Sequence, residues 1–306
     1  MLRCEAALRQ RTVENLRSDN GGLLRMILYD RELLSPYSSR ERGLSDIELS
    51  QAFSGLLVGI VVGFTGVGGG SLMAPILILL LGVAPVTAVG TDLWFAAITK
   101  TVGGSVHHAR GNADLTIVKR LCIGSIPLAV LTLLVLSLTH TEHIDQGIVA
   151  QALGAVLVVT AIATFFRHRL KLYGEQLKRN SAVPFKAFQV PLTIAAGALL
   201  GVLVTLTSVG AGALCATILV FLYPGRLHLK KVVGTDILHA IPLTLVAGLG
   251  HLWLGNVDWL LLVSLLCGSI PGIIVGSLLT HKVNERAIQM ALAAVLVVVG
   301  IKLVLS

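Results

Sequence analysis

The stretch GFTGVGGGSLMAP, Gly63 to Pro75, interrupts a long uncharged apolar run. Six of its thirteen residues are glycine or proline, which hold an α-helix least well. A chain that crosses a membrane is expected to stay helical through such a run. The stretch therefore predicts a break in a membrane-embedded helix.

The composition indicates a membrane protein. Of the 306 residues, 55% are hydrophobic and 13% are charged, the latter about half the charged fraction of a soluble domain. Uncharged stretches of about 20 residues recur, and each is long enough to cross a hydrocarbon core of about 30 Å. We therefore expect an all-α polytopic membrane protein.

The cysteines and the net charge argue against a metal, a cofactor and a nucleic-acid partner. The scattered cysteines show no metal-ligand or disulfide spacing, so we expect neither a metal nor a cofactor. The net charge of +8 arises from basic residues clustered in a few loops, a topology signal that does not point to nucleic acid. The first 47 residues alternate Arg with acidic residues and predict a polar, disordered arm.

The chain contains two copies of one design. The segment GLLVGIVVGFTGVGGGSL at 55–72 aligns with GALLGVLVTLTSVGAGAL at 197–214. With two residues inserted, further identities follow in a constant register: VGTD at 89–92 with 233–236, His107 with His251, and GSIP at 124–127 with 268–271. Such a repeat predicts a duplicated fold.

We therefore divide the chain into four parts: the arm at 1–47, a transmembrane repeat at 48–166, a basic cytoplasmic linker at 167–187 and a second repeat at 188–306. Each repeat is expected to form two short helices around its glycine-rich break and then three helices of spanning length. The short pairs are predicted at 51–66 with 70–82 and at 190–206 with 210–222. The longer helices are predicted at 86–107, 117–138, 146–166, 230–252, 258–279 and 286–305.

Loop charge favours folding each short pair into a hairpin. The two short elements together cover about 31 residues, or roughly 46 Å of helix, too long for one straight span. With the pairs as hairpins, the basic linker and the basic loops at 226–231 and 281–286 all lie on the cytoplasmic side. Each repeat then crosses the membrane three times, so the repeats are inverted, an arrangement typical of secondary transporters.

The breaks are the predicted substrate site. A break of this kind frees backbone N–H groups at the start of a half-helix, where the positive dipole end favours an anion, and hydroxyl groups add donors. Close helix packing through small residues is the alternative. The candidate residues at the two breaks are Thr65, Gly66, Gly68, Gly69, Gly70, Ser71, Thr207, Ser208, Gly210 and Gly212.

Ionisable residues within the predicted spans are the second group of candidates, because charges at membrane depth usually line an interior path. Lys100 lies mid-span, and we weigh direct anion binding against a structural pair with Asp92 or Asp236 and against snorkelling. Asp92, Asp236 and His239 are candidates for coupling or gating. First-turn residues capped by the preceding threonines remain the alternative for the two aspartates.

The span ends carry weaker signals. GNAD at 111–114 and GNVD at 255–258 predict turns that end a span, with Asn and Asp as local caps. His107, His108 and His251 lie near span ends, which favours an interfacial position. No arrangement of residues predicts a catalytic site, so an enzyme is not expected.

Taken together, the motifs resemble the TauE/SafE sulfite exporter family, also called the 4-toluene sulfonate uptake permease family. The resemblance rests on GVGGGSLMAPIL at 66–77, AVGTDL at 88–93, RGNAD at 110–114 and a weaker second copy between 208 and 258. It implies a multi-pass transporter of the plasma membrane, that is, of the bacterial inner membrane, built from two repeats and moving sulfite, sulfonates, thiosulfate or other small organic anions.

The expected function is therefore secondary transport of a small sulfur-containing anion by alternating access. A passive anion channel and a membrane-embedded enzyme are the alternatives. The expected partners are the small anion and the lipid bilayer, with protons as a coupling ion and a second copy of the chain in a homodimer as further candidates.

Overall fold

The computed structural model describes residues 49–65, 70–109, 111–138, 146–180, 185–279 and 285–305. They belong to one compact unit, Glu48–Ser306. All regular structure within these ranges is α-helical, which confirms the all-α class. The predicted arm at 1–47 lies outside the described residues, and so do Gly66, Gly68 and Gly69 of the first break.

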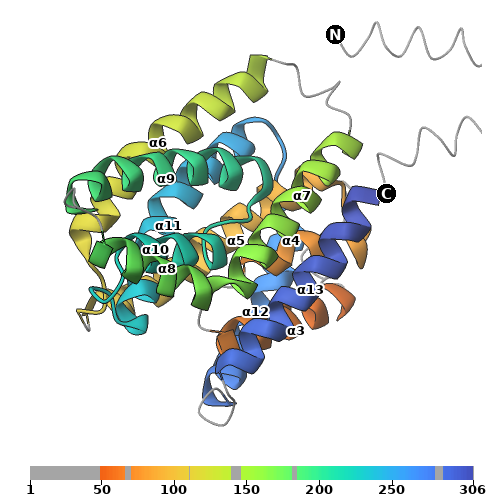
Figure 1. Ribbon diagram of the computed structural model, residues 1–306. Coiled ribbons are helices and arrows are strands. Elements are labelled where there is room, and N and C mark those ends of the chain that lie inside the picture. Colours follow the sequence, from red (N-terminus) through yellow and green to blue (C-terminus); the bar gives the residue numbers. More distant parts are fainter. Residues whose placement is uncertain are drawn as a thin grey trace, which may run out of the picture. The chain divides into compact units, whose positions relative to one another are not determined.

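Each repeat contributes one helix before its break, one after it, and then three further helices (Figure 1). Repeat 1 contains α3 (Leu49–Thr65), α4 (Gly70–Leu79), α5 (Pro85–Ala109), α6 (Leu115–Leu138) and α7 (Gln146–Phe165). Repeat 2 contains α9 (Phe185–Thr207), α10 (Ala213–Leu222), α11 (Leu229–Trp253), α12 (Trp259–Leu279) and α13 (Glu285–Leu305). Between them, the predicted linker contains a helix that the sequence analysis did not foresee, α8 (Arg167–Asn180).

Four described helices are long and apolar enough to cross a membrane: Leu115–Leu138, Phe188–Thr207, Lys230–Trp253 and Trp259–Gly276. A fifth is added if α7 and α8, which are bent by 64°, count as one span. Of the six predicted spans within the described residues, α6, α11 and α12 meet this combination of length and apolar character, α7 meets it only together with α8, and α5 and α13 do not. For α5 the reason is the polar residues of its sequence, which a helix packed inside a bundle can accommodate.

The α9 helix is longer than predicted. A short element at 190–206 was expected, but α9 begins at Phe185 and contains a stretch of spanning length. Gln189, near the start of α9, donates a 2.8 Å hydrogen bond to the carbonyl oxygen of Leu222 at the end of α10. Because the end of α10 lies beside the start of α9, α10 runs back along α9, as in the expected hairpin.

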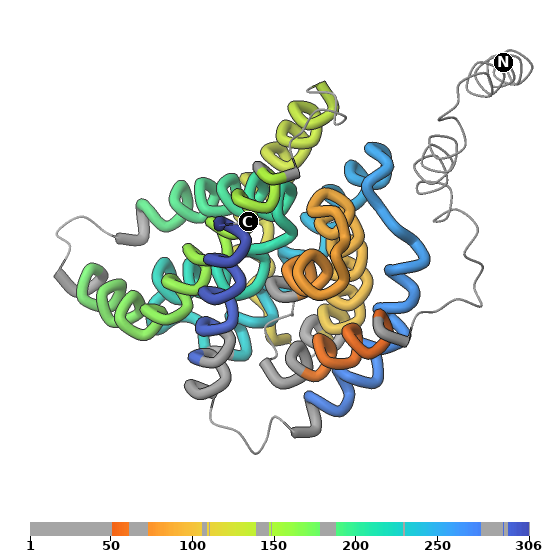
Figure 2. Tube along the Cα trace, turned by 90° about the vertical axis from the view of Figure 1, so that its right-hand side faces the viewer, coloured from red at the N-terminus to blue at the C-terminus, as the bar shows by residue number. Residues whose placement is uncertain are grey.

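The most extensive helix contacts join the two repeats. α3 of repeat 1 packs against α12 of repeat 2, and α6 of repeat 1 packs against α9 of repeat 2. Figures 1 and 2 show α3 beside α12. A Cβ at Gly59 would overlap the carbonyl oxygen of Ser269, and one at Gly201 would overlap that of Ser125. Gly201 corresponds to Gly59 and Ser125 to Ser269, so the two interfaces are equivalent and need small residues for close approach.

Corresponding helices of the two repeats run antiparallel where they pack. On α5, Trp94 donates a 2.9 Å hydrogen bond from Nε1 to the carbonyl oxygen of Gly248, and Gly104 lies beside Ile241. Rising residue numbers on α5 therefore meet falling numbers on α11. α7 and α13 pack in the same antiparallel way. Inverted repeats require this relation; the sidedness in a membrane stays a prediction.

Candidate functional site

Lys100 on α5 lies at the break of the other repeat. Its side chain is buried, and Nζ donates a 2.9 Å hydrogen bond to the carbonyl oxygen of Ala211. Ala211 lies between α9 and α10, where the backbone leaves the helical conformation: φ is 57° at Ser208, 117° at Gly210 and 142° at Gly212. Glycine adopts such angles at little cost, which explains its presence at this break. A cation of repeat 1 therefore lies against the non-helical backbone of repeat 2.

Two carboxylates accompany this cation. Asp92 on α5 and Asp236 on α11 are buried, and each interacts electrostatically with Lys100. Both carboxylate oxygens of Asp92 and the Oδ1 of Asp236 lack a hydrogen-bond partner among the described residues. We call Asp92, Lys100 and Asp236 the Lys100 cluster. If all three side chains are ionised, the cluster carries a net charge of −1.

The surroundings of the two carboxylates differ. Asp236 faces the backbone of Gly212 and the thiol of Cys215 at the start of α10. Asp92 faces the hydroxyl of Ser208 and the backbone of Ala74, without reaching hydrogen-bond geometry. The start of this half-helix is the place where the sequence pattern predicts binding of an external anion. In this structure the carboxylate of Asp236 lies at that place.

His239 on α11 extends the site. Its Nε2 lies 3.0 Å from the hydroxyl oxygen of Ser125 on α6, in a buried contact. The ring also interacts electrostatically with Lys100, and its Nδ1 has no partner among the described residues. The structure thus brings His239 together with the Lys100 cluster, and it adds Ser125 and Cys215, which the sequence analysis had not assigned to a site.

The break residues themselves divide into two groups. Thr207 stabilises the break locally, because its hydroxyl donates to the carbonyl oxygen of Leu203 at 2.6 Å and accepts from the backbone N–H of Val209 at 3.2 Å. Ser208, Gly210 and Gly212 belong to the non-helical backbone around Ala211. Ser208 lies beside Asp92, and Gly212 lies beside Asp236. In the first break, Thr65 ends α3 and Gly70 and Ser71 begin α4, but their surroundings are not described.

One alternative from the sequence is wrong. Asp92 and Asp236 are not first-turn residues, because α5 begins at Pro85 and α11 begins at Leu229. His251 lies in the last turn of α11 with its side chain buried, and its Nε2 lies 2.9 Å from the carbonyl oxygen of Thr205 on α9; its depth in a membrane stays a prediction. The neighbouring helix α9 covers the end of α11, which the sequence of α11 alone does not reveal. The side chains of His107 and His108 lie outside the description.

The threonines next to the two aspartates join the repeats. The Thr91 hydroxyl accepts a 3.1 Å hydrogen bond from the backbone N–H of Asp258, and the Thr235 hydroxyl accepts a 2.9 Å hydrogen bond from that of Asp114. Thr235 corresponds to Thr91 and Asp114 to Asp258, so the two contacts are equivalent. The predicted turns are confirmed, since Asp114 and Asp258 each use Oδ1 to cap the helix that follows.

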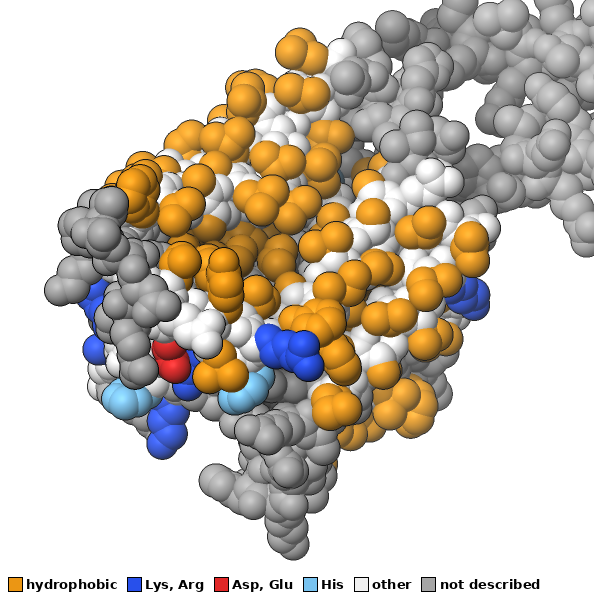
Figure 3. Space-filling view, in the orientation of Figure 1, with side chains coloured by type: hydrophobic (Ala, Val, Ile, Leu, Met, Phe, Trp, Pro, Cys, Tyr) orange, Lys and Arg blue, Asp and Glu red, His pale blue; other side chains and the backbone are white. Residues whose placement is uncertain are grey.

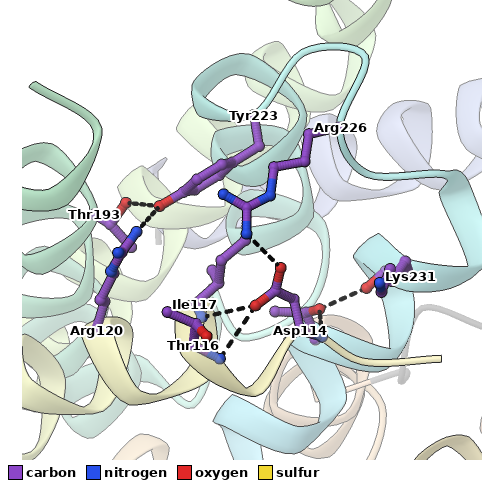
Figure 4. A network of polar contacts seen from close by, with 9 residues as sticks. Asp114, Thr116, Ile117, Arg120, Thr193, Tyr223, Arg226 and Lys231 are labelled. Carbon is purple, nitrogen blue, oxygen red and sulfur yellow. Dashed lines mark hydrogen bonds and ion pairs between the residues drawn. The ribbon is translucent and has the colours of Figure 1, made fainter. Parts of the chain in front are cut away.

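One of these turns also carries ion pairing (Figure 4). Arg226, in the loop between α10 and α11, forms a 3.0 Å ion pair with Asp114, and its guanidinium lies 5.5 Å from the centre of the Tyr223 ring. The Tyr223 hydroxyl accepts a 3.4 Å hydrogen bond from Arg120 and lies 2.8 Å from the Thr193 hydroxyl. We call these residues the Arg226 cluster. From the sequence alone, the charges of this loop indicate only the topology.

Comparisons with known proteins agree with this architecture. The sequence model of the family "Sulfite exporter TauE/SafE" matches residues 52–303. The chain is 39% identical to the "Probable membrane transporter protein YjnA" of Bacillus subtilis, over 84% of this chain and 100% of that protein. It is 28% identical to YdhB and 25% identical to YunE, probable membrane transporter proteins of the same organism, over 81% and 82% of this chain and 96% and 94% of theirs. No solved structure matches the chain.

The family match covers both repeats, and the apolar helices described above are those of a multi-pass membrane protein. The resemblance seen in the sequence motifs is thereby confirmed. The chain belongs to the TauE/SafE sulfite exporter family of membrane transporters.

Proposed function

We propose that the chain is a secondary transporter that carries a small sulfur-containing anion together with a proton, and that the Lys100 cluster is its central site. The observation that carries this proposal is the position of the cluster. It joins the antiparallel helices α5 and α11, one from each repeat, and it lies against the break at Ala211. Transporters built from inverted repeats hold substrate and coupling ion at discontinuous helices between the repeats.

Charge balance gives the cluster a mechanism. Buried charges are costly unless they are paired, and one lysine can neutralise only one of two carboxylates. Taking up one proton on Asp92 or Asp236 makes the cluster neutral. Taking up a second proton leaves the ammonium group of Lys100 without a counter-ion, so that a substrate anion can replace the lost carboxylate charge. Anion and proton then bind together and move in the same direction.

The alternating access that we propose requires the ends of the two repeats to separate in turn. The Asp114–Arg226 ion pair joins a loop of repeat 1 to a loop of repeat 2. It would have to break whenever the repeats separate at that end. This contact supports a gate at the loop before α6 and the loop after α10, which the loop charges predict to lie on the cytoplasmic side.

The substrate class follows from the size of the charge and from the family. A single ammonium group, that of Lys100, balances one negative charge of a small anion. The name of the family specifies sulfite. We therefore propose sulfite and short sulfonates as the first substrates to test. Each presents oxyanion groups that a lysine and the hydroxyl of Ser208 can hydrogen-bond.

The test is uptake of labelled sulfite by proteoliposomes that contain the wild type or one of three variants. Lys100→Gln is expected to lower the initial rate at least tenfold, and the double variant Asp92→Asn/Asp236→Asn to remove the dependence on the proton gradient, because neither carboxylate is left to take up a proton. Lys302→Gln is the matched control, because Lys302 is exposed near the end of α13. Wild-type uptake by Lys100→Gln would overturn the proposed site.

A further inference from the structure

The α8 helix has no counterpart in the predicted architecture, and its direction sets it apart. It follows α7 directly, and the two helices are bent by 64°. α8 is polar, with five Lys and Arg residues among its 14, and does not qualify as a span by itself. A polar helix that turns away at the end of an apolar one suits a position along the membrane surface.

The inner face of α8 is fixed to the protein. Gly174 is buried, and a Cβ at this position would lie 2.6 Å from the backbone oxygen of Phe221 on α10. The ring of Tyr173 stacks on that of Phe221, with 6.5 Å between the ring centres and 7° between the planes. Arg167, at the start of the helix, is also buried. The packing therefore determines which side of α8 faces outward.

The outer face combines cations with apolar groups. The side chains of His168, Arg169 and Lys171 are exposed, and so is Leu172. Over its whole length the helix contains Arg167, Arg169, Lys171, Lys178 and Arg179 and one acidic residue, Glu175. The last two residues of the preceding segment, Phe165 and Phe166, expose their rings beside it.

This combination is unfavourable in water and favourable at a membrane surface. In the interfacial region, Leu172 and the phenylalanine rings can contact acyl chains while the cations reach the phosphate groups. Hydrophobic side chains cover most of the face shown in Figure 3, and the Lys, Arg and His side chains gather in its lower half. Clusters of four to eight basic residues next to a membrane helix are typical of binding sites for anionic headgroups.

We propose that the outer face of α8 binds the phosphate headgroups of anionic phospholipids, with phosphatidylglycerol as the probe. Charge complementarity carries the choice of occupant, because the exposed cations Arg169 and Lys171 lie on either side of the exposed Leu172, and an anionic membrane interface supplies phosphate groups for the cations and acyl chains for the leucine. Since α8 packs against α10, a bound lipid also stabilises the half-helix whose start lies at Ala213.

The experiment titrates the purified full chain in detergent with phosphatidylglycerol or with phosphatidylcholine of the same acyl chains, and follows the melting temperature. Phosphatidylglycerol is expected to raise the melting temperature of the wild type more than phosphatidylcholine does. Arg169→Gln/Lys171→Gln should need a concentration of phosphatidylglycerol roughly tenfold higher for the same shift. Leu172→Gln should weaken the response to both lipids.

The control variant is Lys119→Gln/Lys230→Gln, which removes the same charge from exposed sites on α6 and α11. It should keep the wild-type response. Inorganic phosphate at matched concentration should not replace the lipid. Equal responses to the two lipids, a full response of Arg169→Gln/Lys171→Gln, an equal loss in the control variant, or replacement by inorganic phosphate would each overturn the proposal.

Discussion

The turns before α6 and α12 share one sequence pattern and the same backbone contacts, but among the described residues only the turn before α6 also forms an ion pair. In both turns an aspartate donates its backbone N–H to a threonine of the other repeat, Thr235 for Asp114 and Thr91 for Asp258. At Asp114, the charged side chain of Arg226 completes an ion pair. The corresponding loop of repeat 1, between Leu79 at the end of α4 and Pro85 at the start of α5, contains no charged residue.

The difference teaches how a duplicated chain can become functionally asymmetric. The shared residues determine how the helices of the two repeats pack. Substitutions at a few loop positions then give the two ends different chemistry without changing that packing. In the proposed alternating access, opening the Asp114 end requires breaking an ion pair, whereas the described residues at the Asp258 end show no such pair.

The largest expected effect concerns the shared packing. Replacing Gly59 or Gly201 by Ala forces a Cβ against the backbone oxygen of Ser269 or Ser125. Each variant is expected to lower the free energy of unfolding by about 3 kcal/mol, because backbone has to move at a close helix contact. Thermal unfolding in detergent measures this loss. A large difference between the two variants would contradict the equivalence of the two interfaces.

A smaller effect is expected at the shared hydrogen bonds. Thr91→Val and Thr235→Val keep the shape of the side chain and leave a backbone N–H of the other repeat without its acceptor. Each should lower the free energy of unfolding by about 1–2 kcal/mol. Thr→Ser at the same positions retains the hydroxyl and serves as the control. Unequal losses from the two Val variants would show that the turns are not equivalent.

The smallest effect isolates the difference between the two ends. Asp114→Asn and Asp258→Asn both retain Oδ1 as a helix cap, but only the first removes an ion pair. The first variant should therefore lose about 0.5–1 kcal/mol more stability than the second, as expected for a partly exposed pair. The difference should disappear at about 1 M salt, where the Debye length is near 3 Å. A difference that persists in salt would rule out an electrostatic origin.

Much of the fold could be predicted because it depends on local sequence. Apolar stretches determined where the longer helices lie, and the turn residues Gly111 and Gly255 adopt the positive φ that their motif predicts. The long-range partners could not be predicted. Asp114 and Arg226 are 112 residues apart, and only packing between repeats brings them together.

The candidate site was predicted in part, because residue types are visible in the sequence and contacts between helices are not. Lys100, Asp92, Asp236 and His239 were recognisable as ionisable residues inside apolar spans, and the structure brings them together. That Asp236 lies at the start of α10, where an external anion was expected, depends on how α11 packs against α10. The sequence of neither helix contains this information.

Coupling between proton and anion is the central claim, and uphill accumulation tests it most directly. Proteoliposomes with equal labelled sulfite inside and outside are given an inward proton gradient, and the internal label is followed with the membrane potential held at zero. The account predicts that wild-type vesicles accumulate sulfite above the external concentration and that Asp92→Asn/Asp236→Asn vesicles do not. Wild-type vesicles in which sulfite stays at the external concentration would contradict it and would indicate a passive anion channel.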